Sequence, residues 1–161
     1  MHEREDAARR AMKIAMGIAM AVLGNREDAA DVAQDVALDV LRSLGRLREP
    51  AAFDAWVRKI AVRHAVRARR RRTAVGSVPE PVMSDERDMV IASRAALSRA
   101  LADLPPRQAI ALVLRYVHDL TDREIAAALG CRRGTANALL SRGRAALREV
   151  AELQELMEAT R

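Results

Sequence analysis

The chain has 161 residues and a formal net charge of +6, and half of its residues are hydrophobic, whereas aromatic residues make up only 2%. Much of the apolar content is alanine, which favours small helical bundles with close helix contacts over a large sandwich or barrel. The single cysteine, Cys131, excludes a disulfide within the chain and fits a reducing cytosol, while the basic balance suits a polyanion such as nucleic acid or an acidic membrane surface.

The first two predicted elements are helices. Residues 3–23 form one helical pattern, and the apolar stretch 11–24 is too short to cross a bilayer, so we expect a buried helix of a bundle. Asn25 is placed to cap a second helix that runs to about Leu44. Its inner stripe would be Val32, Val36, Val40 and Leu44. A second stripe at the same spacing is acidic and consists of Glu27, Asp31, Asp35 and Asp39.

A loop over residues 44–50 precedes a third predicted helix, from about Ala51 to Arg72. Residues 42–72 contain eleven Lys or Arg against two acids, a net charge of +9, so the rest of the chain sums to −3. One surface is therefore expected to meet a polyanion, and the acidic stripe a cationic partner.

Residues 73–84 contain two prolines and a glycine without helical period, which indicates a linker. Ser84 can cap the next helix, whose inward residues would be Met89, Val90, Leu97, Leu101 and Leu104. Pro105 and Pro106 end that helix, and a short one follows to about His118, with Ile110, Leu114 and Val117 inside. We therefore predict an all-α fold with two small helical domains, residues 1–72 and 85–161, joined by a flexible linker over 73–84.

Residues 120–149 have the pattern of a helix-turn-helix. Thr121 and Glu124 form a capping box, and Gly130 suits the left-handed end of the first helix. The second helix begins at about Arg132 or Arg133 and is expected to turn Ala136, Leu140, Gly143 and Leu147 inward. The opposite face is basic, which favours DNA binding, although an ordinary helical hairpin with a solvated basic face has the same pattern.

No catalytic pattern is recognisable. The three histidines, His2, His64 and His118, are scattered over separate predicted helices. We find no metal-ligand spacing, no phosphate-binding glycine loop and no nucleophile–base pair, and we expect neither catalysis nor a cofactor.

Two motifs carry a family resemblance. The first half contains Asp28-Ala-x-Asp31-x-x-Gln34-Asp35 and a Phe-x-x-Trp-x-x-x-Ile-Ala run from residue 53, and the second contains Leu-Pro-Pro-Arg-Gln at 104–108 and Gly134-Thr135. Over about residues 10–150 the chain resembles the extracytoplasmic-function class of bacterial RNA polymerase sigma factors, with their regions 2 and 4. The resemblance implies a cytoplasmic alternative sigma factor that binds core RNA polymerase, recognises promoter DNA and supports transcription initiation.

The resemblance also assigns residues to roles. The second helix would dock on a coiled coil of the largest polymerase subunit through Asp31, Gln34, Asp35 and Leu41. The downstream promoter element would be opened and held by Arg46, Arg48, Phe53, Trp56, Arg63, Arg67 and Arg70, within an arginine run that continues over Arg69 to Arg72. The upstream element would be contacted by Arg132, Arg133, Thr135, Asn137 and Arg142. An anti-sigma protein is a further possible partner, able to hold the two domains closed on each other.

Simpler interpretations remain beside these roles. The acidic stripe has the composition of a solvated helix face, and core packing is the favoured interpretation of Phe53 and Trp56. The recognition helix departs from many relatives, because residues 136–139 read Ala-Asn-Ala-Leu and lack two cations, and Arg133 replaces a usual aliphatic residue. The alternative function is therefore a sigma-like DNA-binding regulator that does not engage polymerase.

Overall fold

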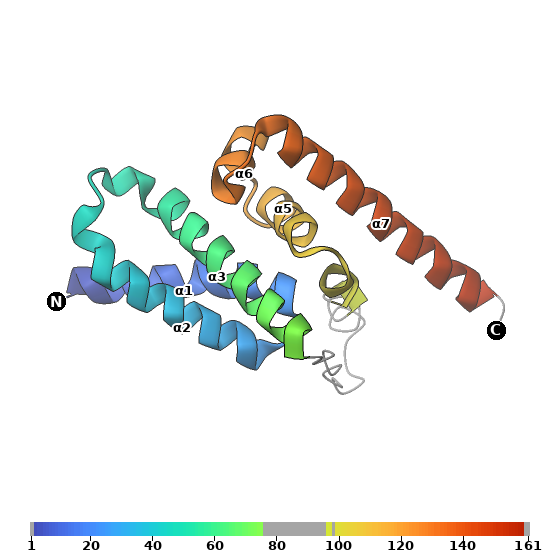
Figure 1. Ribbon diagram of the computed structural model, residues 1–161, viewed down its shortest axis with the longest axis horizontal. Coiled ribbons are helices and arrows are strands. Elements are labelled where there is room, and N and C mark those ends of the chain that lie inside the picture. Colours follow the sequence, from blue (N-terminus) through green and yellow to red (C-terminus); the bar gives the residue numbers. More distant parts are fainter. Residues whose placement is uncertain (1, 76–95, 98, 160–161) are drawn as a thin grey trace.

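The computed structural model describes residues 2–75, 96–97 and 99–159, and these residues are all-α, as predicted (Figure 1). The helices are α1 (His2–Leu23), α2 (Arg26–Ser43), α3 (Phe53–Val75), α5 (Pro106–Tyr116), α6 (Asp122–Leu129) and α7 (Arg133–Ala159). Two short 3-10 turns, Leu44–Arg46 and Pro50–Ala52, lie between α2 and α3. A helical stub at 96–97 and 99–103 precedes α5.

Several helix ends follow from local chemistry. Gly24 has a positive φ of 63° directly after α1, where a residue without Cβ is favoured. The Asn25 side chain accepts hydrogen bonds from the amides of Glu27 and Asp28, at 2.8 and 3.1 Å, and so caps α2 as predicted. Pro50 occupies the first position of a 3-10 turn, and α3 begins only at Phe53, two residues later than predicted. A proline is tolerated there because first-turn amides have no partner within a helix.

Helices α1, α2 and α3 form the first bundle. Its fully buried side chains include Ile18, Val22, Val36, Val40 and Val57. The largely buried Arg72 guanidinium donates to the Leu23 carbonyl at 3.0 Å and pairs with Asp28 at 2.8 Å. Because α1 ends at Leu23 and Asp28 lies in the first turn of α2, this arginine holds the three helices together at one end.

Helices α5, α6 and α7 form the second bundle. Leu114, Ile125 and Leu140 are fully buried in it. Gly143 lets α7 approach α5 closely, because a Cβ at this position would lie only 2.9 Å from Leu112 Cδ1. The capping box predicted at the start of α6 is present, and Gly130 ends α6 with φ 62°.

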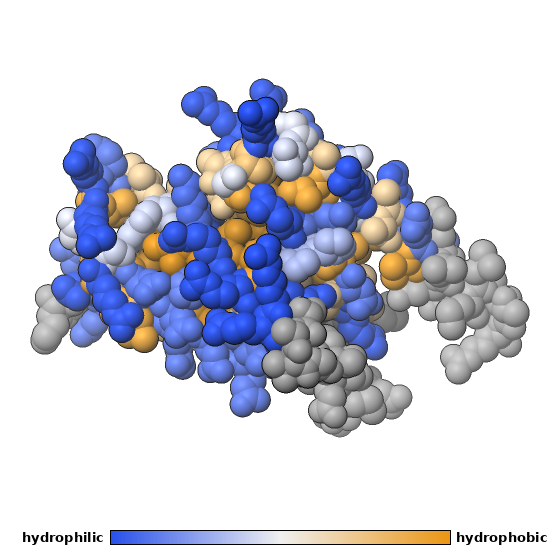
Figure 2. All heavy atoms as spheres, viewed as in Figure 1, coloured by the Kyte–Doolittle hydropathy of each residue, from blue (hydrophilic) through white to orange (hydrophobic). Residues whose placement is uncertain are grey.

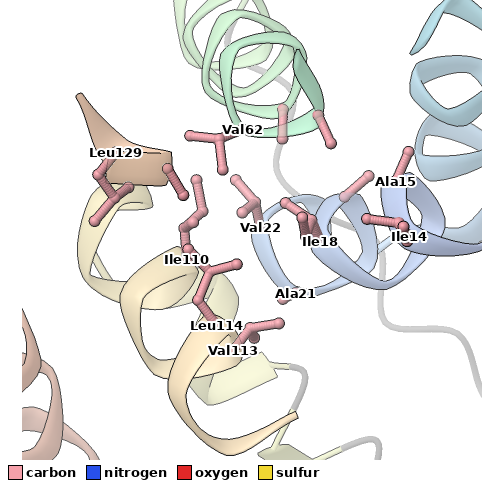
Figure 3. Close-up of a cluster of buried hydrophobic side chains, with 14 of the residues drawn as sticks. Ile14, Ala15, Ile18, Ala21, Val22, Val62, Ile110, Val113, Leu114 and Leu129 are labelled. Atoms are coloured by element: carbon pink, nitrogen blue, oxygen red, sulfur yellow. The ribbon is translucent and has the colours of Figure 1, made fainter. Parts of the chain in front are cut away.

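The two bundles pack against each other along a contact that we call the seam, where α1 meets α5 and α3 meets α5 and α6. Figure 3 shows apolar side chains converging there, among them Val22 from α1, Val62 from α3, Ile110 from α5 and Leu129 from α6. The Arg69 guanidinium adds polar links, donating to the carbonyls of Val22 and Ala102. The described residues therefore share one continuous core.

Three predictions need correction or lie outside the described residues. Leu97 and Val117 were expected inside but are 52% and 69% exposed. Val117 is the C-cap of α5 and its amide still donates to the Val113 carbonyl at 2.9 Å, so it keeps the helical direction but lies beyond the buried part of the helix. Leu97 lies in the short stub before α5. Thr73–Val75, which the sequence assigns to the linker, continue α3. The remaining linker, the Ser84 cap, Met89 and Val90 lie outside the described residues.

Candidate functional site

The outer face of α2 carries the residues expected to dock a protein partner. Asp31, Gln34 and Asp35 are exposed, whereas Val32 and Val36 are buried on the opposite side. Leu38, one turn further on, is 48% exposed and was not predicted to belong to this face. The sequence could have indicated this exposure, because Leu38 is an apolar residue that lies outside the buried stripe of Val32, Val36 and Val40. Residues 31, 34, 35 and 38 share one side of the helix, so the face combines two carboxylates, an amide and an apolar side chain.

Two other residues of α2 contribute less to that face than predicted. Leu41, included in the docking set, is only partly exposed. The Asp39 carboxylate, fourth in the acidic stripe, contacts His64 Nε2 on α3 at 2.8 Å and Arg42 at 3.5 Å. Asp39 therefore links α2 to α3, and the exposed acidic face is shorter than the sequence stripe.

The connection between α2 and α3 presents Arg46 and Arg48 to solvent. Both side chains are exposed, and Leu47 between them is partly buried against the core. The loop is thus fixed by its apolar residue, while the two cations point away from the bundle.

Phe53 and Trp56 meet at the start of α3. Phe53 is only 8% exposed and packs edge to face with Trp56, with ring centroids 6.1 Å apart. The Arg10 guanidinium lies 5.5 Å from the centroid of the Phe53 ring and pairs with Asp54 at 2.7 Å. Phe53 is therefore a core residue that supports Trp56, and the partly exposed Trp56 is the side chain of the pair that can stack on a base.

The arginines of α3 divide into two groups. Arg63, Arg67, Arg70 and Arg71 are exposed, and their spacing places them along one side of the helix. Figure 2 shows hydrophilic side chains gathered over the part of the molecule where α3 lies. These four residues form what we call the α3 basic strip.

Arg69 and Arg72 do not belong to that strip, contrary to the expectation that the whole run 69–72 faces DNA. Both guanidinium groups donate to backbone carbonyls. The pKa of Arg69 is lowered, mainly because the group is partly buried and also because the positive charge of Arg72 lies near it. Their inward direction could have been recognised from their positions in the sequence. Residues 69 and 72 follow the buried Ala61 and Ala65 at steps of four and three residues, which keeps them on the same side of the helix.

The start of α7, with Arg132 directly before it, presents all five residues predicted to contact the upstream element. The exposed side chains are Arg132, Arg133, Thr135, Asn137 and Arg142. Ala136, Leu140 and Gly143 are buried on the opposite side, as predicted. Arginine can pair with guanine through two hydrogen bonds and asparagine with adenine, so this face has the chemistry for reading base edges in a major groove.

An open hollow of about 740 Å³ lies beside this face, between the end of α5, the start of α6 and α7. Arg115 and Asp122 form an ion pair across it, and Arg144 contacts the Tyr116 hydroxyl at 3.4 Å. The hollow adds cations that the sequence prediction did not assign to the site. Its lining consists of Arg115, Thr121, Asp122, Arg123, Arg133, Asn137, Leu140, Ser141 and Arg144.

Two further features bear on what these surfaces can do. Within the part of the chain that the structure describes, no group of three or more His, Cys, Asp or Glu side chains is arranged to hold a metal ion. No described helix is long and apolar enough to span a bilayer. What the described residues offer is an acidic face on α2 and basic faces on α3 and α7.

Comparison with known proteins assigns both halves of the chain. The family model of sigma-70 region 2 matches residues 7–75, and that of sigma-70 region 4 matches residues 94–147. The RNA polymerase sigma-E factor of Streptomyces coelicolor is 33% identical over 129 residues, which cover 76% of this chain and 71% of the relative. The ECF RNA polymerase sigma factor SigE of Mycolicibacterium smegmatis is 32% identical over 145 residues, covering 82% of this chain but only 55% of that longer protein.

A solved structure shows the same fold. The sigma factor RpoE of Bartonella quintana, crystallised with the anti-sigma factor NepR, matches with a TM-score of 0.72 and 19% identity. The match covers 94% of this chain and 98% of that one. The two family models, in the order that the sequence motifs predict, and the relatives above 30% identity place this chain in the sigma-70 family, as an alternative sigma factor of the extracytoplasmic-function class that acts in transcription initiation.

Proposed function

We propose that this sigma factor binds core RNA polymerase through the outer face of α2 and contacts promoter DNA through the α3 basic strip and the start of α7. The observation that carries this proposal is the separation of charge on the described surface. Acidic residues are exposed on α2, and arginines are exposed on α3 and α7. A surface of this kind suits one basic protein partner and one polyanion.

The family resemblance implies the docking partner, and the chemistry of α2 supports it. Asp31 and Asp35 can pair with Lys or Arg of a helical partner, and Leu38 supplies apolar area between polar neighbours. Interfaces gain most from centres that become fully desolvated on binding and are surrounded by polar contacts. A basic coiled coil of the largest polymerase subunit fits this face, with Gln34 as hydrogen-bonding neighbour.

The downstream promoter element is assigned to the first bundle. Arg46 and Arg48 from the loop and the α3 basic strip supply a cationic path for a DNA backbone, and Trp56 supplies a stacking surface for an unpaired base. Single strands are bound by this combination of cations and aromatic side chains. Phe53 would act indirectly, by fixing the position of Trp56.

The upstream element is assigned to α7 and the hollow next to it. Arg132, Arg133 and Asn137 are exposed where base edges can be read, with Thr135 and Arg142 beside them. The hollow brings Arg115, Arg123 and Arg144 close to that face. We assign Arg123 and Arg144, whose side chains are exposed, to backbone phosphates, which set register and affinity but carry no sequence information, whereas Arg115 is paired with Asp122.

A protein inhibitor is compatible with the fold. The structural neighbour was solved with an anti-sigma factor, and we propose an anti-sigma protein as a second partner of this chain. The alternative function, a DNA-binding regulator without polymerase contact, would not need the acidic face of α2.

The decisive experiment is co-elution of the full chain with bacterial core RNA polymerase on a sizing column, without DNA. We expect the wild-type chain to co-elute and the Asp31→Arg, Asp35→Arg variant not to. The matched control is Glu149→Arg, Glu155→Arg, which makes the same change in net charge at exposed positions of α7 and should still co-elute. A folded wild-type chain that fails to bind polymerase would favour the regulator, and equal loss in both variants would remove the α2 face from the proposal.

A further inference from the structure

His118 lies in the turn after α5, and its ring enters the seam between the two bundles. Its Nε2 lies against Gly17 of α1, where a Cβ built on the glycine would be 3.8 Å away, an ordinary van der Waals distance. The Nε2 atom is buried and has no hydrogen-bond partner among the described residues. A buried nitrogen without a partner is uncommon and calls for an explanation.

The charged groups around His118 come from three helices. Arg58 on α3 acts on it as a like charge once the ring is protonated, whereas Asp54, also on α3, acts in the opposite direction. Asp54 is already paired with Arg10 of α1. Glu124 on α6 also lies near Arg58, whose positive charge helps to lower the pKa of the Glu124 carboxyl. Burial is the largest cause of the lowered pKa of His118, and Arg58 is the next.

The remaining contacts of the seam are mainly apolar, and the further carboxylate that acts there, Asp103, acts on Arg69. Val62, Ile110 and Leu129 meet there as buried apolar side chains. Arg69, which links the bundles through the carbonyls of Val22 and Ala102, is itself cationic. A neutral imidazole fits between these groups, whereas an imidazolium would be desolvated next to Arg58.

We propose that the free chain is closed through the seam and that protonation of His118 opens it. In the closed form His118 binds a proton less readily than it does when exposed to water. The open form therefore binds more protons, and closure is favoured above the ordinary histidine pKa of about 6.5 and weakened as the pH falls below it. Histidine is suited to this role because small changes in its surroundings move its charge across this range.

Opening would change how the basic surfaces are presented. The α2 face and the start of α7 are already exposed in the closed form, so closure does not cover them. Closure instead fixes the distance between the two bundles and ties the Arg69 guanidinium to the Ala102 carbonyl of the second bundle. Separation of the bundles would break that bond next to the α3 basic strip and let the two bundles move independently.

The test is the distance between two spin labels in the full chain, measured by pulsed electron resonance. Labels are attached to Glu27→Cys on α2 and Glu149→Cys on α7, both exposed, in a Cys131→Ser background. At about pH 7.5 we expect one narrow distance. At about pH 5.5, below the histidine pKa but above that of ordinary carboxyl groups, we expect a second, broad and longer population.

Two substitutions fix the charge at position 118. His118→Gln should keep the narrow distance at both pH values, and His118→Lys should give the long population at both. His64→Gln is the control, because His64 lies within the first bundle next to Asp39 and should leave the response of the wild-type chain unchanged. Helix content from circular dichroism establishes that each variant is folded.

Three results would overturn the proposal. The first is a broad distance at pH 7.5 in the folded wild-type chain, which would mean that the closed form is not populated. The second is an unchanged narrow distance at pH 5.5. The third is a response to pH that persists in the folded His118→Gln variant, which would place the titrating group elsewhere.

Discussion

At the scale of single residues, position on the helix decides what an arginine of α3 does. Arg67 and Arg70 are exposed, while Arg69 and Arg72 reach backbone carbonyls at the ends of neighbouring elements. Arginine suits both uses because its five donors bind phosphates and carbonyls alike. The density of the run predicts a polyanion site, but only the packed helices show which members of the run are exposed to solvent.

Gly143 provides a residue-scale test of helix packing. We expect Gly143→Ala to lower the free energy of unfolding by about 1 kcal/mol, because the overpacking penalty of about 1–3 kcal/mol exceeds the gain of up to about 1 kcal/mol in helix propensity. The new Cβ would lie 2.9 Å from Leu112 Cδ1 and 3.2 Å from its Cγ, and Leu112 is buried and has little room to move. Urea unfolding followed by circular dichroism measures the difference.

Gly134 is the matched control for that substitution. It lies in the first turn of α7, and a Cβ there would meet nothing within 4 Å. Gly134→Ala should leave stability unchanged or raise it by up to about 1 kcal/mol. Equal effects of the two substitutions would contradict a close contact between α7 and α5.

At the scale of elements, the sequence predicts those helix ends that depend on neighbouring residues. Asn25 caps α2, and Thr121, Glu124 and Gly130 define α6, because caps are local interactions. The helix α3 begins two residues after the predicted start at about Ala51, and Val117 is exposed although it was expected inside. Where the turn before α3 ends, and where neighbouring helices stop covering α5, is set by packing, so helical spacing carries no information about either.

The capping box of α6 gives a pH prediction. The Thr121 amide donates to Glu124 Oε2 at 2.8 Å, and this hydrogen bond, followed by that from the Thr121 hydroxyl, lowers the pKa of Glu124. A carboxylate with a lowered pKa adds stability above its unfolded pKa of about 4.3, and this contribution disappears as the pH falls through the folded value. Glu124→Gln keeps an accepting oxygen but not the charge.

We therefore expect the wild-type chain to be more stable than Glu124→Gln near neutral pH, with the difference shrinking below about pH 4. Urea unfolding at a series of pH values measures it. Glu149→Gln, at an exposed position of α7, is the control for the general loss of one negative charge. A difference that stays constant down to about pH 3 would show that the carboxylate charge does not contribute through the cap.

At the scale of the whole molecule, the sequence predicts two charged surfaces and two bundles but not their contact. Ile110 and Leu114 were expected inside, and they are buried. Their spacing predicts that they are buried but not which helix covers them. Val62 and Leu129, which lie at the contact between the bundles, cannot be distinguished by their apolar character from residues buried within one bundle. The exposed acidic face of α2 was predicted in outline. The exposure of Leu38 and the hollow beside α7 were not predicted, because they depend on packing and on helices distant in sequence.

The arrangement of arginines predicts how DNA binding depends on salt. If Arg67 of the α3 basic strip contacts one phosphate, Arg67→Ala should reduce the slope of log affinity against log salt concentration by about 0.7–0.9, without changing the free energy of unfolding. Arg72→Ala should do the reverse, because Arg72 is bound to Asp28 and the Leu23 carbonyl. The measurement is fluorescence anisotropy of a duplex with an unpaired segment, titrated with each folded variant at several salt concentrations. An unchanged slope for Arg67→Ala, or equal slope losses for both variants, would mean that exposure on α3 does not identify the arginines that contact DNA.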